Sequence, residues 1–146
     1  MRNMLSEVNN NYSDYIIMMF DGDRMIFDDI IDRSLDNFID NGITISYFNP
    51  YEAGFYVDGK DLADSFIDRK KVFLIAPPFI YPSNVVNSAM QYAIDNNLRD
   101  MYLHELVVRL GYEVSFIKCS MHNLKITEPG DIEVAKSMIN ECSHNW

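Results

Sequence analysis

Charged side chains follow a continuous apolar run near the beginning of the chain. Residues 15–20 are apolar, and Asp21-Gly22-Asp23-Arg24 comes directly after them. Asp21 could bind Mg²⁺ or a substrate hydroxyl, or it could form a turn with Gly22. Arg24 could hold a phosphate through two hydrogen bonds, or it could pair with Asp21 or Asp23.

Lys125 is a second candidate for phosphate binding, because it lies where an expected strand leads into the last expected helix. Its ammonium group is a compact point charge that suits a phosphate; the alternative is a solvated surface lysine. The net charge of −10, from 12 basic and 22 acidic residues, means that a phosphate must be held by a local cluster of cations. The same charge disfavours binding to a nucleic-acid backbone and suits a soluble protein.

The chain length of 146 residues suits one domain, and 48% hydrophobic and 13% aromatic residues indicate a folded core. No apolar run approaches the roughly 18 residues of a membrane span, and the polar start lacks the layout of a signal peptide. Cys119 and Cys142 have no CxxC spacing, so we expect reduced thiols in a cytoplasmic protein. The three histidines lack metal-ligand spacing and receive no role.

The pattern of apolar residues predicts the elements that position these groups. Strands are expected over residues 15–20, 43–48, 72–75 and 114–117, the third being stopped by Pro77-Pro78. Helices are expected over residues 30–41, 83–94, 103–110 and 132–139, with Ser83 as a cap of the second. Asp58-Gly59 indicates a hairpin.

Alternation of strands and helices predicts an α/β sheet. In such sheets the ligand site lies outside the carboxyl ends of the strands. The segments 21–25, 76–80 and 123–127 are therefore expected to line the site.

Four segments, in this order, resemble the methylerythritol-phosphate and ribitol-phosphate cytidylyltransferase family. Phe20-Asp21-Gly22-Asp23-Arg24 is similar to the family's Asp-Ala-Ala-Arg-Pro, with Met25 in place of the proline. Ile67-Asp68-Arg69 is similar to the apolar-Asp-Arg that closes the family's β-arm, and Ala76-Pro77-Pro78-Phe79 to its Thr-Pro-Gln-x-Phe. The most specific match is Asn-Leu-Lys-Ile-Thr-Glu-Pro-Gly-Asp at residues 123–131, with Ala135 beyond it, against Asn-Ile-Lys-Ile-Thr-x-Pro-x-Asp.

The resemblance covers residues 2–139 but starts midway through the family's domain. The Gly-rich loop that wraps the phosphates of CTP in the family has no counterpart, since the six glycines form neither a Gly-x-Gly nor a P-loop arrangement. Ala76 stands where the family has a threonine hydroxyl, and Arg69 lies one residue closer to Pro77-Pro78 than expected. The family's Thr-Asp before the penultimate helix is not reproduced, and Asp100 is the nearest acid.

The resemblance implies a three-layer, Rossmann-like fold of the nucleotide-diphospho-sugar transferase type. It implies a truncated, mostly parallel sheet with a projecting β-arm at about residues 49–70. Residues 1–146 would form a single domain that resembles the C-terminal half of a cytidylyltransferase.

The resemblance also implies roles for individual residues. Lys125 and Arg69 would be catalytic, with Arg69 reaching from the arm into the partner's site unless it only pairs with Asp68 or Asp64. Asp21, Arg24, Lys125 and Asp100 would bind the substrate, and Asp21 is the candidate ligand for Mg²⁺. CTP would be the co-substrate, and the arm would form a homodimer.

The implied reaction is transfer of CMP from CTP to a polyol phosphate, either 2-C-methyl-D-erythritol 4-phosphate or ribitol 5-phosphate. This chain would supply the half that binds the acceptor phosphate and forms the dimer. The alternative is a catalytically inactive remnant that binds a phosphate ester or mediates oligomerisation. The choice between the two acceptors stays open, because both carry a phosphate and vicinal hydroxyls.

Overall fold

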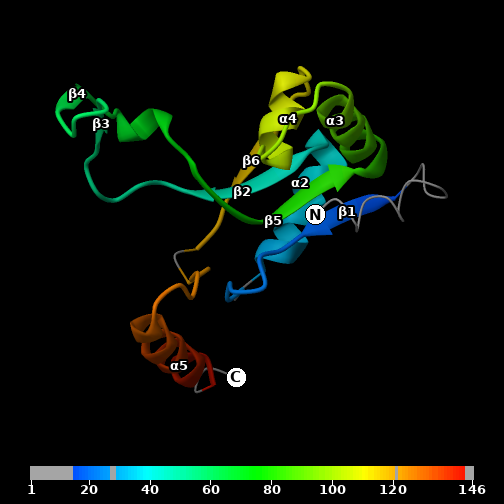
Figure 1. Cartoon of the computed structure of the whole chain (residues 1–146). Helices are drawn as coiled ribbons and strands as arrows, with labels where there is room; N and C mark the ends of the chain where they lie inside the picture. Colours follow the sequence, from blue (N-terminus) through cyan, green and yellow to red (C-terminus); the bar gives the residue numbers. More distant parts are fainter. Residues whose placement is uncertain (1–14, 27–28, 121, 144–146) are drawn as a thin grey trace.

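The structure is a computed structural model that describes residues 15–26, 29–120 and 122–143. Its main sheet has four strands in the order β1-β5-β2-β6 (Figure 1). These strands are β1 (Ile16–Met19), β2 (Thr44–Phe48), β5 (Leu74–Pro82) and β6 (Ser115–Lys118). All four predicted strands are present, and the α/β class is confirmed.

The direction of β5 corrects the prediction of a mostly parallel sheet. Strand β5 pairs antiparallel with both β1 and β2, and only β2 and β6 pair in parallel. Strands β1, β2 and β6 therefore run in one direction, with β5 reversed between two of them. The reason is the connection: β2 leads out to the arm and β5 returns from it, which makes the two strands an extended hairpin rather than a crossover unit.

The prolines of β5 do not end the strand, contrary to the prediction. Ile45 pairs with Phe79 and Tyr47 pairs with Ile75, so that Pro77-Pro78 lies in an irregularity where the ladder with β2 is interrupted. The ladder with β1 begins only at Met19 and Phe79, beyond both prolines. A residue without an N–H group is tolerated at such a bulge.

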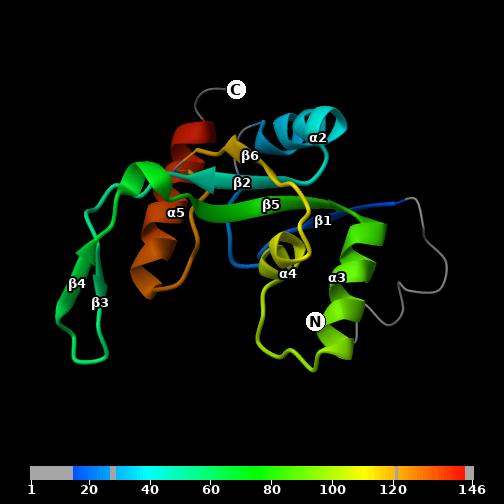
Figure 2. The same cartoon turned by 90° about the horizontal axis from the view of Figure 1, so that it is seen from above.

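Helices cover both faces of the sheet, which gives the predicted three layers (Figure 2). Helix α2 (Ile30–Asn41) covers one face, and helices α3 (Ser83–Asp95) and α4 (Leu103–Arg109) cover the other. The alternation of side chains along β2 serves both layers. Ser46 meets Ser34 of α2 at 3.3 Å between hydroxyl oxygens, while Ile45 belongs to the apolar core under α3 and α4.

Two helix ends differ from the prediction. Ser83 is the first residue of α3 and not its N-cap, which is Pro82; the Oγ of Ser83 accepts a hydrogen bond from the backbone N–H of Tyr15 at 3.3 Å. The last helix, α5 (Pro129–Ser143), begins earlier than predicted. Asp131 explains the early start, because its Oδ2 accepts the backbone N–H groups of Thr127 and Glu128 at 2.8 and 2.9 Å.

The predicted arm projects from the sheet as a two-stranded hairpin (Figures 1 and 2). It consists of β3 (Phe55–Val57) and β4 (Ala63–Phe66), followed by the 3₁₀ helix η1 (Arg69–Lys71). Asp58 shapes the turn, since its Oδ1 accepts the backbone N–H groups of Lys60 and Leu62 at 2.8 and 3.0 Å. The hairpin predicted at Asp58-Gly59 is confirmed.

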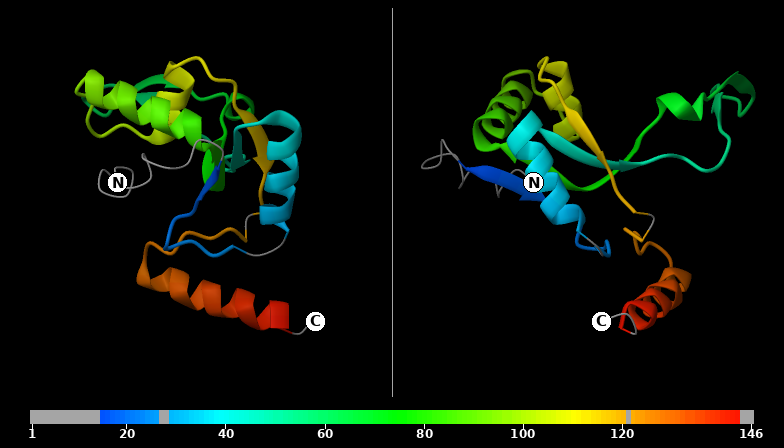
Figure 3. Two further views of the ribbon diagram at one scale, coloured as in Figure 1. Left: turned by 90° about the vertical axis from the view of Figure 1, so that its right-hand side faces the viewer. Right: turned by 180° about the vertical axis from the view of Figure 1, so that it is seen from behind.

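Helix α5 lies apart from the three layers, beyond the end of the sheet where β1 leads into the segment that follows it (Figure 3). In the left view of Figure 3, the segment that follows β1 and the segment that precedes α5 lie side by side, in the space between the sheet and α5. None of the helices in the described ranges is both long and apolar enough to cross a membrane.

Candidate functional site

The segments that carry Arg24 and Lys125 pair with each other. These two residues form an isolated antiparallel bridge. The backbone N–H of Met25 donates to the carbonyl of Leu124 at 2.9 Å, and that of Ile126 donates to the carbonyl of Asp23 at 2.8 Å. Two charged groups that are far apart in the sequence are therefore held together by main-chain hydrogen bonds.

Arg24 is largely committed to protein contacts. Its side chain is 9% exposed, its Nη1 donates to the carbonyl of Asn123 at 2.7 Å, and its Nε lies 3.6 Å from the Asp21 carboxylate. The side chain of Asn123 in turn donates from Nδ2 to the carbonyl of Pro77 at 2.6 Å. Arg24 thus links the end of β1 to the segment before α5, and Asn123 links that segment to β5.

Lys125 is more accessible than Arg24. Its side chain is 44% exposed, and its Nζ lies 3.7 Å from the carboxylate of Asp23. Leu124 and Ile126 on either side are half-buried, so the side chain of Lys125 points the other way. An accessible ion pair at this distance contributes little to folding and leaves the ammonium group open to a ligand.

A cavity of about 400 Å³ brings three of the predicted site residues together, namely Asp21, Arg24 and Lys125. Ile75 and Phe79 of β5 also line it, so all three predicted segments meet here. Met19, Asp21 and Arg24 place the cavity at the carboxyl end of β1, where the sheet was expected to bind ligands. The roles assigned to these residues stay predictions.

The remaining wall of the cavity consists of residues that the sequence reasoning did not assign. Tyr81, Tyr102, Leu103 and His104 line it. The rings of Tyr102 and His104 are stacked, with centroids 5.2 Å apart and planes 10° apart, and Phe79 lies 5.8 Å from the imidazole. Tyr102, Leu103 and His104 lie at the start of α4. The sequence feature that could have drawn attention to them is the absence of the family's Thr-Asp just before this helix.

Buried polar atoms without a hydrogen-bond partner concentrate at this site. Within the described part of the chain they are Arg24 Nε, the Tyr81 hydroxyl and Asn123 Oδ1. Arg24 and Tyr81 line the cavity, and Asn123 contacts Arg24. An unsatisfied buried donor or acceptor costs about 1–3 kcal/mol, so such groups are retained at places where a ligand or a water molecule can satisfy them.

Burial changes the protonation of two side chains in the wall. It raises the pKa of the Tyr81 phenol, which therefore stays neutral. It lowers the pKa of His104, and the neighbouring Glu105 carboxylate opposes this effect in part. The imidazole of His104 is therefore mostly neutral at neutral pH.

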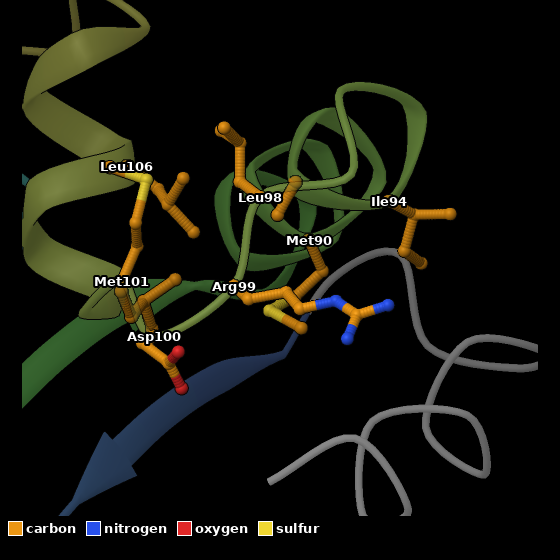
Figure 4. A pocket seen from close by; sticks show the side chains of 9 residues that line it. Met90, Ile94, Leu98, Arg99, Asp100, Met101 and Leu106 are labelled. Carbon is orange, nitrogen blue, oxygen red and sulfur yellow. The ribbon is translucent and has the colours of Figure 1, made fainter.

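Asp100 and Arg69 lie elsewhere. Asp100 borders a second cavity, of about 390 Å³, beside Arg99 and between α3 and α4 (Figure 4). Arg69 lies at the base of the arm, where its Nη1 donates to the carbonyl of Tyr51 at 2.6 Å. Within one chain, the structure does not bring either residue to the cavity of Lys125.

The described residues do not form a preformed magnesium site. Among them there is no group of three or more acidic, histidine or cysteine side chains that could hold a metal ion. Asp21 faces Arg24, and Asp23 faces Lys125, so each carboxylate already has a cationic neighbour. Mg²⁺ is usually held by one or two carboxylates together with substrate phosphates, so Asp21 as its ligand stays a prediction from the resemblance.

Sequence comparison finds relatives of the two kinds suggested by the motifs. No family model matches the chain. The chain is 28% identical over 127 residues to a ribitol-5-phosphate cytidylyltransferase of Vibrio parahaemolyticus, covering 86% of this chain and 53% of the relative. It is 25% identical over 129 residues to a 2-C-methyl-D-erythritol 4-phosphate cytidylyltransferase of Syntrophus aciditrophicus, covering 88% of this chain and 55% of the relative. Its curated relatives are cytidylyltransferases.

This finding confirms the resemblance read from the four motifs. The chain spans about half the length of these two curated relatives. What those enzymes do as whole proteins is therefore not transferred to this chain as a finding.

Solved structures of the same kind share the fold. One is the 4-diphosphocytidyl-2C-methyl-D-erythritol synthase of Anaerococcus prevotii, with a TM-score of 0.81 and 15% identity over 95% of this chain and 64% of that one. Another is the 2-C-methyl-D-erythritol 4-phosphate cytidylyltransferase of Francisella tularensis, with a TM-score of 0.78 and 22% identity over 92% and 64% of the two chains. The predicted type of fold is confirmed.

Proposed function

We propose that this chain forms the acceptor-binding part of a CTP-dependent cytidylyltransferase, which transfers CMP to a polyol phosphate. The observation that carries the proposal is the cavity shared by Asp21, Arg24 and Lys125. On a chain with a net charge of −10, backbone pairing brings two basic residues to one cavity, and the accessible ammonium group of Lys125 would meet the anion there.

The reaction requires positioning and charge neutralisation more than covalent help. A phosphate oxygen of the acceptor attacks the α-phosphorus of CTP, the bond to the β-phosphate breaks, and pyrophosphate leaves. Lys125 would hold the acceptor phosphate with a point charge, and Asp21 would accept a hydrogen bond from an acceptor hydroxyl. Arg24, with 9% of its side chain exposed, would keep Lys125 in place. Magnesium ions commonly neutralise the phosphates in such transfers, but no step proposed for these residues depends on one.

The acceptor is a polyol phosphate of either predicted kind. 2-C-Methyl-D-erythritol 4-phosphate and ribitol 5-phosphate are both supported, because relatives named for each of them match this chain. A cavity of about 400 Å³ suits a small phosphorylated polyol.

We further propose that two copies of the chain associate through the arm. Phe55 and Phe66 face each other across the hairpin with ring centroids 5.3 Å apart, yet they are 57% and 61% exposed. Exposed aromatic side chains on a projecting hairpin favour a protein partner. Arg69, at the base of this arm, would then approach the partner's cavity.

A second candidate function is phosphate-ester binding without turnover. It is favoured by the glycine spacing, since none of the six glycines forms part of a Gly-x-Gly or P-loop arrangement. The two functions share the same cavity and the same cationic residues. They differ only in the handling of CTP.

Calorimetric titration of the chain tests the shared part of both functions. We expect binding of ribitol 5-phosphate or 2-C-methyl-D-erythritol 4-phosphate, and no binding of unphosphorylated ribitol under the same conditions. Absence of binding to both phosphorylated polyols would refute the proposal. Equal binding of ribitol and its phosphate would show that the phosphate is not what the cavity recognises.

A further inference from the structure

We propose that His104 is an additional ligand-binding residue of this cavity, and that its imidazolium form contacts the anionic group of the bound substrate. The identity of that substrate as a polyol phosphate rests on the proposed function. The contact between His104 and an anion rests on the cavity itself.

The position of the imidazole is fixed by its neighbours. Its ring is stacked on Tyr102 and lies beside Phe79, at centroid distances of 5.2 and 5.8 Å. None of the hydrogen bonds within the described part of the chain involves this side chain. An imidazole in a cavity wall that is half-buried and has no hydrogen-bond partner among the described residues can offer a ring nitrogen to a ligand.

The cavity needs another donor to hold a phosphate fully. A phosphate monoester has three terminal oxygens, and each can accept more than one hydrogen bond. The Nη1 of Arg24 already donates to the carbonyl of Asn123, and its side chain is nearly buried. Lys125 is therefore the basic residue that a ligand can reach more easily. His104 lines the same space from α4, and its imidazolium would add a charge-assisted hydrogen bond.

Charges on several elements bear on the titration of His104. On α4 itself, the Glu105 carboxylate favours the protonated form of His104. The guanidinium of Arg109 lies 3.9 Å from that carboxylate and offsets part of its charge. Asp21, Arg24 and Lys125 border the cavity from the other segments.

The remaining titratable neighbours are phenols. Tyr102 is stacked on the imidazole, and Tyr81 of β5 is neutral because burial raises its pKa. Burial is the largest influence on His104 and lowers its pKa. Burial therefore favours the neutral imidazole, and a bound anion would favour the imidazolium.

This arrangement links ligand binding to proton uptake. If an anion raises the pKa of His104 by about one unit, the protonated form must bind that anion about tenfold more tightly than the neutral form, because the coupling is reciprocal. Affinity should then increase as the pH falls through the pKa. The probe must not titrate in the same range, and a phosphate monoester does, with a second pKa of about 6. Inorganic sulfate stays doubly charged and avoids this ambiguity.

Proton NMR of the 146-residue chain tests the inference, because only three histidines contribute imidazole signals and His104→Gln identifies one of them. With sulfate present, we expect the pKa of His104 to rise by about one unit, whereas the imidazole signals of the exposed His122 should not respond to sulfate. In His104→Gln, sulfate affinity should fall about tenfold near pH 5.5 and stay unchanged near pH 8. His122→Gln should match the wild type at both values.

The outcomes separate this inference from the proposed function. Sulfate binding without a change in the pKa of His104, or an equal loss of affinity at both pH values in His104→Gln, overturns the inference. Binding of ribitol 5-phosphate that depends on Lys125 but not on His104 overturns the inference alone. A sulfate-induced rise in the pKa of His104 with no preference for ribitol 5-phosphate over sulfate supports the anion contact and refutes the proposed substrate.

Discussion

Arg24 and Lys125 pair as an antiparallel bridge, and only one of them has an accessible charge. The guanidinium of Arg24 is nearly buried and donates to the carbonyl of Asn123, whereas the ammonium group of Lys125 is 44% exposed. We therefore expect the two basic residues to have different tasks. The buried one would organise the segment, and the accessible one would meet the ligand.

Replacing Lys125 tests the second task. Lys125→Ala should weaken binding of ribitol 5-phosphate or 2-C-methyl-D-erythritol 4-phosphate by about 1–3 kcal/mol, the value of a charge-assisted hydrogen bond. The free energy of unfolding should hardly change, because the ion pair with Asp23 is accessible. Calorimetry and urea denaturation measure the two quantities. Lys136→Ala removes another exposed, carboxylate-paired lysine and should leave affinity intact; equal losses in both variants would contradict the assignment.

Replacing Arg24 tests the first task. Arg24→Met keeps most of the apolar stem but leaves the Asn123 carbonyl without its donor, so we expect a loss of about 1–3 kcal/mol in the free energy of unfolding. Arg33→Met is the matched control, since Arg33 also donates to a backbone carbonyl, that of Lys118, but is exposed. Its loss should stay below about 1 kcal/mol. Similar urea midpoints for the two variants would show that Arg24 does not organise the site.

The chain alone should not turn over CTP. The triphosphate needs a nest of backbone N–H groups, and the six glycines of this sequence do not provide that spacing. A pyrophosphate-release assay with CTP, Mg²⁺ and either acceptor should give the background rate. A full-length relative assayed in parallel confirms that the reagents work. Pyrophosphate release well above background by this chain alone would contradict the prediction, because it would mean that CTP is bound without a Gly-rich loop.

The arm should hold two copies together. Phe55→Ser combined with Phe66→Ser removes the aromatic pair of the hairpin and should convert a dimer into a monomer at micromolar concentration. Ile39→Ser serves as the control, because Ile39 is also an exposed apolar residue but lies on α2. Sedimentation velocity distinguishes the species. A monomeric wild type, or an unchanged dimer in the double variant, would count against the arm.

Acid should loosen the start of α5. Hydrogen bonds from the backbone N–H groups of Glu128 and Thr127 lower the pKa of Asp131. The stabilisation is therefore complete above the unfolded pKa of about 4 and is lost as the pH falls through the lower, folded pKa. Asp131→Asn should speed amide hydrogen exchange at Thr127 and Glu128 near neutral pH. The amide of Cys119, which donates to Tyr47, should be unaffected; unchanged exchange at Thr127 would contradict this cap.

Local signals in the sequence predicted most of the elements correctly. The apolar run before Asp21, the Asn41-Gly42 helix end and the turn at Asp58-Gly59 each depend on neighbouring residues only, and each is present. The role of Ser83 was missed because its hydroxyl contacts Tyr15, which no local pattern reveals. The length of β5 was missed because a ladder interruption opposite β2 accommodates Pro77-Pro78.

The site was predictable where its residues belong to motifs and hidden where tertiary packing decides. The resemblance predicted that Asp21, Arg24 and Lys125 belong to one binding site, and the structure places all three at one cavity. His104 belongs to no motif, and its place in the cavity wall beside Tyr102 depends on tertiary packing. Asp100 was chosen by sequence proximity, but it has a positive φ of 60° and borders a different cavity.

The hydrogen bond from Asn123 to Pro77 has a consequence for folding. It joins the segment before α5 to the middle of β5, and the bridge between Arg24 and Lys125 joins that segment to the end of β1. Both contacts join segments that are distant in sequence, and such contacts form late because the loops between them must close first. A partly folded chain would have no binding cavity, so ligand capture would report completion of the tertiary structure. A ligand at about 100 times its dissociation constant would raise the free energy of unfolding by about 2.7 kcal/mol.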